Sequence, residues 1–101
     1  MAHEGLHEPE QVLSAATTDM HRALVSLQEE FEAVDWYRQR ADGCQDAQLE
    51  AILLHNMREE MEHAAMIIEW LRRNNTEFES QLRDYLFTDA PITEAQEQAT
   101  D

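Results

Sequence analysis

Residues 47–73 read AQLEAILLHNMREEMEHAAMIIEWLRR and carry a clear helical pattern. Their main apolar positions recur at helical spacing and share one face: Leu49, Ile52, Leu53, Ile67 and Trp70. Arg72 and Arg73 close the segment, where positive charge complements the helix dipole. The pattern predicts a long helix from Ala47 to about Arg73.

A second helical pattern lies upstream, from Pro9 to about Ala41. Proline suits the first position of a helix because its missing N–H group needs no partner there. The apolar positions again fall three, four or seven residues apart: Leu13, Met20, Leu24, Leu27, Phe31 and Val34. Between the two patterns, Gly43 is placed to end the first helix and Asp46 to cap the second.

Downstream, Asn74-Asn75-Thr76 interrupts the pattern. Thr76 with Glu79 has the form of a capping box, which predicts a short helix from Glu77 to about Phe87. We expect 85–87 to dock this helix onto an apolar surface. The predicted organisation is a disordered N-terminus over residues 1–8, a single helical hairpin domain over 9–90, and a flexible acidic tail over 91–101.

Composition restricts the function. Twenty-two acidic residues against seven basic ones give a formal net charge of −15, which repels nucleic acid and suits divalent cations or a basic protein surface. Two glycines and two prolines favour an all-α fold. No apolar run is long enough to span a membrane, and one cysteine, Cys44, allows no intrachain disulfide. We therefore expect a cytoplasmic protein.

An antiparallel hairpin of two long helices leaves part of each apolar stripe facing water. A bundle normally places four helices around its core, so two hairpins satisfy both chains at once. The predicted fold is an all-α antiparallel two-helix hairpin with a short C-terminal helix, dimerising into a ferritin-like four-helix bundle.

Carboxylates interrupt the apolar stripes. Glu30 lies about 60° from Leu27 around the helix axis, and Glu60 lies about 20° from Leu53. His63 follows Glu60 by one turn in a Glu-x-x-His motif, so both side chains project from one face. Buried carboxylates are normally paired or bound to metal.

Carboxylate oxygens with one imidazole suit non-haem iron or manganese. Ferritin-like di-iron bundles take a Glu from each of two helices and a Glu-x-x-His from each of two others. One chain supplies half of that set, in Glu30, Glu60 and His63, and a two-fold dimer completes it. The alternative is an ordinary solvated cluster, because Glu and His three residues apart are common on exposed helices. Tyr37 and Trp36 are equally consistent with core packing.

Several blocks of the sequence resemble the encapsulated ferritins over residues 7–93. They are HEP at 7–9, EEFEAVDWY at 29–37, HN at 55–56, EEMEHAAM at 59–66, EWLRR at 69–73 and YLFT at 85–88. The resemblance implies a two-helix half-ferritin whose di-iron ferroxidase centre forms between two chains. It also implies dimers that assemble into a ring of ten subunits, a homodecamer.

By motif position, the resemblance puts Glu30, Glu60 and His63 on the iron ligands, with Glu60 bridging. Tyr37 falls on a tyrosine that lines the centre. A further group falls on a metal-entry site that would take Ca²⁺ or another divalent cation: Glu29, Glu32 and Trp36. The implied cofactor is iron, two per dimer.

The resemblance also implies iron storage inside an encapsulin nanocompartment, with the shell protein as partner. Family members usually carry a C-terminal targeting peptide, which the sequence up to Asp101 lacks. Either that peptide has been removed or the shell partnership does not hold, and both readings stay open.

The predicted function is therefore a ferroxidase that oxidises Fe(II) to Fe(III) with O2. Two alternatives remain at this stage. One is a rubrerythrin-like di-iron peroxidase, and the other is a non-enzymatic acidic helical adaptor that binds a basic partner.

Overall fold

The computed structural model describes residues 5–95, and within them every regular element is helical. The chain divides between Ile68 and Glu69 into two compact units, which are described separately. The prediction of an all-α fold is confirmed. The expected behaviour of residues 1–4 and 96–101 lies outside the described residues.

The first long helix starts later than predicted. A 3-10 helix, η1, spans Glu10–Val12, and Leu13 is then extended, so α1 spans Ala15–Asp42. Ser14 caps α1 because its Oγ accepts a hydrogen bond from the Thr17 N–H at 3.1 Å. The predicted start at Pro9 was wrong, since that proline precedes η1 and Ser14 supplies the cap.

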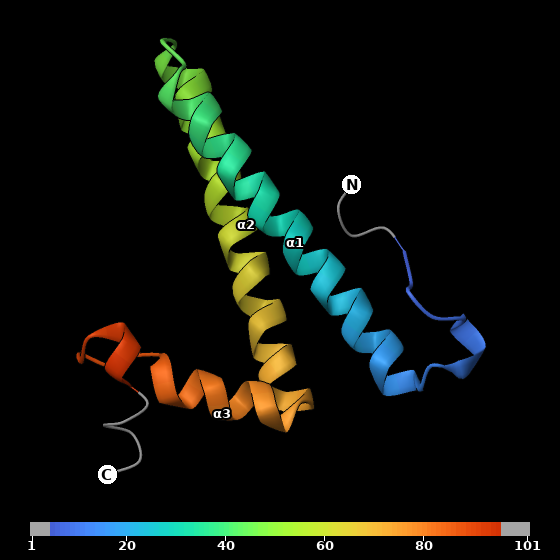
Figure 1. Ribbon diagram of the computed structural model, residues 1–101. Helices are drawn as coiled ribbons and strands as arrows, with labels where there is room; N and C mark the ends of the chain where they lie inside the picture. The colour runs from blue at the N-terminus through green and yellow to red at the C-terminus, as the bar shows by residue number, and fades with distance from the viewer. Residues whose placement is uncertain (1–4, 96–101) are drawn as a thin grey trace. The chain divides into compact units, whose positions relative to one another are not determined.

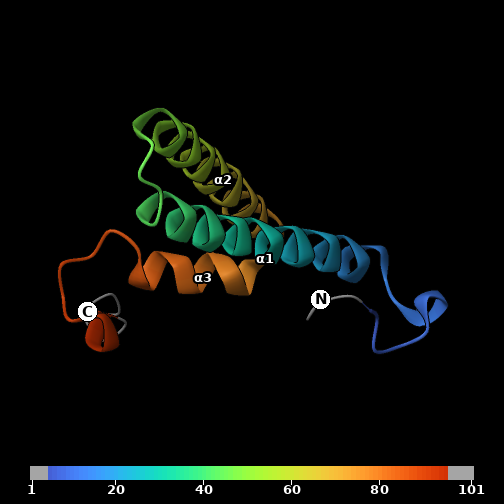
Figure 2. The same ribbon diagram turned by 90° about the horizontal axis from the view of Figure 1, so that it is seen from above.

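The turn between the long helices matches the prediction. Gly43 ends α1 with φ −85° and ψ −4°, and its N–H donates to the Gln39 carbonyl. The Asp46 Oδ1 accepts from the Leu49 N–H at 2.8 Å, which caps α2, spanning Ala47–Asn74. Figures 1 and 2 show the chain turning at this point so that α2 returns antiparallel to α1.

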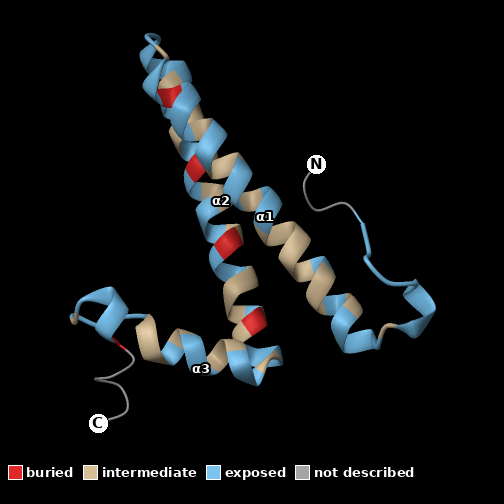
Figure 3. Ribbon diagram, in the orientation of Figure 1, coloured by how far each residue is buried: buried red, intermediate tan, exposed pale blue. Residues whose placement is uncertain are grey.

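Few side chains of the first unit are buried (Figure 3). Its buried hydrophobic residues are Ala41, Met57 and Ala64. By contrast Phe31 is 52% exposed, Ile52 56% and Met66 57%. One hairpin thus leaves large apolar side chains in water, as the sequence predicts, and dimerisation remains a prediction.

In the second unit, α3 spans Thr76–Tyr85 and follows the last turn of α2. Its N-cap is Asn75, whose Oδ1 accepts from the Phe78 N–H at 2.8 Å. The predicted capping box of Thr76 and Glu79 was wrong, because Asn75 takes the cap and Glu79 instead pairs with arginines.

The helix α3 also ends two residues earlier than predicted, at Tyr85. Phe87 follows with φ 58°, in the left-handed region that bulky residues rarely adopt, and its side chain is fully exposed. The expected docking of Phe87 onto an apolar surface was therefore wrong within this chain.

Beyond α3, a second 3-10 helix, η2, spans Ile92–Glu94. Leu71 and Ala95 are the buried hydrophobic residues of this unit, with 2% and 1% of their surface exposed. Within residues 5–95, no helix is long and apolar enough to cross a membrane.

Candidate metal centre

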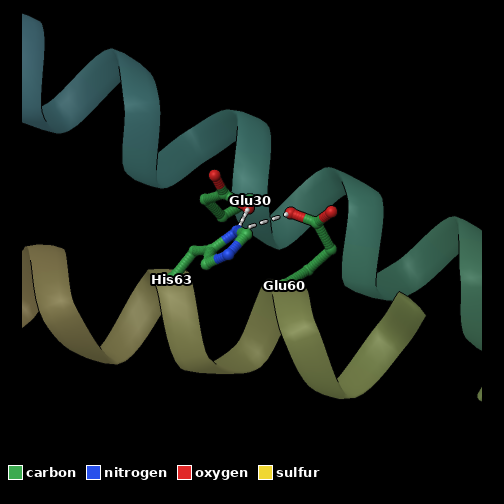
Figure 4. A group of neighbouring side chains, drawn as sticks. All are labelled: Glu30, Glu60 and His63. Carbon is green, nitrogen blue, oxygen red and sulfur yellow. Dashed lines mark ion pairs between the residues drawn. The ribbon is translucent and has the colours of Figure 1, made fainter. Parts of the chain in front are cut away.

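Three metal-ligating side chains converge between α1 and α2 (Figure 4). Glu30 projects from α1, and Glu60 and His63 project from α2. One ligand atom from each lies within 4.8 Å of the other two. The helical periodicity that placed these residues on facing stripes thus brings them together.

The group lies at the margin of the hairpin's packed region. The Glu30 and Glu60 side chains are 22% and 25% exposed, and that of His63 is 41% exposed. Ala64, directly after His63 on α2, is buried. A partly desolvated carboxylate pair is costly without a compensating cation.

The His63 imidazole lies beside both carboxylates. Its Nδ1 lies 3.5 Å from Oε2 of Glu30 and 3.5 Å from Oε2 of Glu60. Desolvation lowers the pKa of His63, but the two carboxylates together outweigh it, so the pKa is raised overall. Metal binding to the imidazole would compete with its protonation.

Glu30 is the least satisfied of the three. Its Oε2 is buried and has no hydrogen-bond partner of ordinary geometry. The pKa of the Glu30 carboxyl is raised, chiefly by a side-chain hydrogen bond with Glu60 and then by burial and the charge of Glu60. His63 acts in the opposite direction. An oxygen buried without a donor is what a bound cation would satisfy.

Two carboxylate oxygens and an imidazole nitrogen fit a non-haem iron or manganese ion. Within residues 5–95, no other group of three or more His, Cys, Asp or Glu side chains gathers in this way. Three donors from one chain leave a metal with open positions, which a second copy would fill with an identical set.

The other predicted site residues lie on α1 outside this group. Tyr37 is half-buried and follows Glu30 by two turns, which keeps it on the same helix face. Glu29 and Glu32 are exposed, and Trp36 is 49% exposed. The structure does not bring these last three together as a metal group among the described residues.

Two local contacts went unnoticed in the sequence. The Arg40 guanidinium lies over the rings of both Trp36 and Tyr37, and His55 pairs with Glu59 at 3.3 Å. Both contacts join residues three or four positions apart on a helix, a spacing at which side chains are neighbours. The sequence shows this spacing, but many other pairs share it, so the spacing alone does not predict which pairs make contact.

A helical hairpin that gathers a Glu and a Glu-x-x-His on facing helices has the arrangement of ferritin-like metal proteins. The EncFtn-like family model matches residues 5–89, which is most of the chain. The chain therefore belongs to the EncFtn-like family. This confirms the resemblance inferred from the sequence.

Two curated relatives carry ferritin-like names. An "Encapsulated ferritin-like protein" from Rhodospirillum rubrum is 59% identical over 87 residues, covering 86% of this chain and 62% of that protein. A "Ferritin-like protein" from Thermotoga maritima is 53% identical over 94 residues, covering 93% of this chain and 82% of that protein. The match thus spans less than two thirds of the Rhodospirillum protein.

A solved structure supports the fold. The crystal structure of a protein from Nitrosomonas europaea matches with a TM-score of 0.84 at 57% identity, covering 88% of this chain and 98% of that chain. The family match and the two relatives connect the chain with ferritin-like proteins.

Proposed function

We propose that the protein is a ferroxidase that oxidises Fe(II) to Fe(III) with O2. The substrate irons would bind at a di-iron centre formed by two copies of the chain, each giving Glu30, Glu60 and His63. The observation that carries this proposal is the three-residue group itself, in which Glu30 Oε2 is buried without a hydrogen-bond partner.

The donor chemistry explains how the residues would act. Iron favours the oxygen and imidazole ligands present here, and its positive charge would compensate the carboxylate pair. His63 and Glu60 come from consecutive turns of one helix, so their relative orientation is set by the helix. The ligands would hold two irons at one centre, where each Fe(II) would give up one electron, and O2 would take up the two electrons with two protons to become hydrogen peroxide.

A second copy is part of the proposal. The exposed Phe31, Ile52 and Met66 give the hairpin an apolar surface that a partner hairpin would cover. The same two-fold pairing would join two groups of three ligands into four Glu and two His. We propose that such dimers assemble further into a ring of ten subunits.

The remaining predicted residues take supporting roles. Tyr37 would line the centre from the α1 side. Glu29, Glu32 and Trp36 would form an entry site that draws divalent cations toward the centre, since the two acids are exposed.

The name of the Rhodospirillum relative supports association with an encapsulin shell, where the oxidised iron would be stored. The proposed location is therefore an encapsulin nanocompartment in the cytoplasm.

Iron loading tests the function directly. Fe(II) is added anaerobically, the excess is removed, and bound iron is counted by elemental analysis before O2 is admitted. Two irons per dimer are expected, followed by rapid formation of Fe(III). Failure to bind stoichiometric iron would favour the acidic adaptor, and faster turnover with H2O2 than with O2 would favour the peroxidase.

A matched pair of variants tests the site. Glu60→Gln and Glu62→Gln make the same change two residues apart on α2, and only Glu60 belongs to the group of three. Fe(II) oxidation should fall by at least about tenfold in the first and stay near the wild-type rate in the second. Equal rates in the two variants would place the reaction elsewhere.

A further inference from the structure

The Arg40 guanidinium covers two consecutive aromatic side chains. Its Cζ lies 5.8 Å from the centroid of the Trp36 ring and 5.5 Å from that of Tyr37. Arg40 follows these residues by four and three positions on α1, so one side chain reaches both rings. Both distances lie within the range of a cation–π interaction.

This arginine differs from most others in the chain. Arg22, Arg72, Arg73 and Arg83 each pair with a carboxylate. Among residues 5–95, no ion pair involves Arg40, although the chain carries 22 acidic residues. Its positive charge is therefore not neutralised by a carboxylate partner and acts on the two rings.

The rings lie next to the candidate metal centre along α1. Tyr37 is seven residues from Glu30, about 10.5 Å along the helix axis and about 20° around it. Indole and phenol rings give up an electron more readily than most other side chains, so they compete with Fe(II) as electron donors. Loss of an electron makes a ring positive, and a cation about 5.5 Å away opposes that change.

We propose that Arg40 is a protective residue that keeps Trp36 and Tyr37 reduced while the neighbouring centre passes electrons from Fe(II) to O2. The role in iron chemistry rests on the proposed function. In the disfavoured reaction, Trp36 gives one electron to an oxidant and becomes a radical cation. Tyr37 first gives one electron to the oxidant, which makes its ring positive, and then loses its O–H proton to water. The oxidant is a partly reduced oxygen species, which gains that electron.

The protein contains an internal reference for this effect. Trp70 is 39% exposed and Trp36 49%, and no cation lies over Trp70 in the described part of the chain. The ratio of oxidised Trp36 to oxidised Trp70 therefore reports the influence of Arg40 rather than the oxidant dose.

The first experiment uses iron-free protein and photogenerated tris(bipyridine)ruthenium(III), a one-electron oxidant. Wild type, Arg40→Gln and Arg40→Lys are compared by peptide mass spectrometry, with circular dichroism to confirm folding. The Trp36-to-Trp70 ratio should rise about threefold in Arg40→Gln and stay near wild type in Arg40→Lys, which keeps the charge. An unchanged ratio in Arg40→Gln, or an equal rise in both variants, overturns the electrostatic role.

The second experiment replaces the oxidant with Fe(II) and O2. More oxidised Trp36 and Tyr37 in Arg40→Gln than in wild type supports protection during iron oxidation. A rise with ruthenium but none with iron overturns the link to iron chemistry. If the wild-type protein oxidises no iron, the proposed function fails, while the iron-free ratio still decides whether Arg40 protects the rings.

Discussion

Two regions on or beside α2 shift the pKa of a glutamate in opposite directions. In the first unit, the candidate metal centre places Glu30 beside Glu60 and raises the pKa of Glu30. In the second unit, Glu69 accepts hydrogen bonds from Arg72 at 2.7 Å and from Arg73 at 2.6 Å, which lower its pKa to about 2. A carboxylate paired with arginine binds a metal ion weakly, because its charge is already compensated. Two carboxylates beside each other repel, and a bound cation relieves that repulsion.

The second region, which we call the arginine cluster, comprises Glu69, Arg72, Arg73, Glu79 and Arg83. Arg72 occupies its centre, with a two-pronged contact to Glu69 and a hydrogen bond to Glu79 at 3.0 Å. Since Glu79 lies on α3, this one side chain connects the last turn of α2 to the following helix. The arginine cluster therefore holds two helices together, whereas the candidate metal centre offers ligands to a cation.

The largest effect should come from placing an arginine in the candidate metal centre, so that its carboxylates are paired as Glu69 is. His63→Arg would give Glu30 and Glu60 a permanent cation, so iron binding should disappear and Fe(II) oxidation should fall on the order of 100-fold. The melting temperature of the iron-free protein should not fall. His55→Arg, beside the exposed Glu59 on the same helix, is the control and should keep its oxidation rate.

The next largest effect should come from removing the central arginine of the cluster. Arg72→Ala should lower the melting temperature of the iron-free protein by about 3–6 °C, because Arg72 is only 31% exposed and bridges two helices. Arg73→Ala is the matched control at the next position. Its side chain is 70% exposed and contacts Glu69 alone, so its effect should be smaller. Equal losses would mean that the bridge to α3 contributes nothing.

A smaller effect should appear in the acid range. The folded-state pKa of Glu69 is about 2 against an ordinary value of 4.5, so its stabilising effect is complete above pH 4.5 and is lost as the pH falls from 4.5 to 2. At pH 7, Glu69→Gln should melt below wild type, and the difference should shrink as the pH falls through that window. Thermal melts followed by circular dichroism measure it. A difference independent of pH would contradict the ion-pair interpretation.

Glu30 should give the smallest effect, with the opposite sign. Its raised pKa means that the folded iron-free protein favours the protonated carboxyl, so ionisation costs stability at neutral pH. Glu30→Gln mimics the protonated form and should melt slightly above wild type at pH 7, with the gain shrinking as the pH falls toward 4.5. A lower melting temperature in iron-free Glu30→Gln would show that the carboxylate pair is not strained.

Much of this arrangement followed from helical periodicity. The 3.6-residue repeat placed Glu30, Glu60 and His63 on facing stripes, and Gly43 and Asp46 marked the turn. Helix faces and turns are determined by residues close together in the chain, so the sequence pattern predicts them. The metal-binding roles of Glu30, Glu60 and His63 remain proposals, as do the supporting roles of Tyr37, Glu29, Glu32 and Trp36.

The errors have local physical causes. Pro9 is compatible with a helix start, but Ser14 offers a hydroxyl to the first free N–H groups and so decides where α1 begins. Asn75 precedes Thr76 by one residue, and its Oδ1 accepts from the Phe78 N–H, so the cap of α3 lies one residue earlier than predicted. Glu79 could have closed a capping box, yet Arg72 and Arg83 offer it stronger, charged donors.

The short connection at residues 43–46 fixes the alignment of α1 with α2. Glu30 lies thirteen residues before Gly43 and Glu60 lies fourteen after Asp46, about 20 Å along each helix. One inserted residue between Glu30 and Gly43 would rotate the earlier part of α1 by about 100° and turn Glu30 away from its partners. In a two-fold dimer that single insertion would occur in both copies and misalign both halves of the centre. The arms between the turn and the candidate centre can therefore change length only in steps that restore the same helix face.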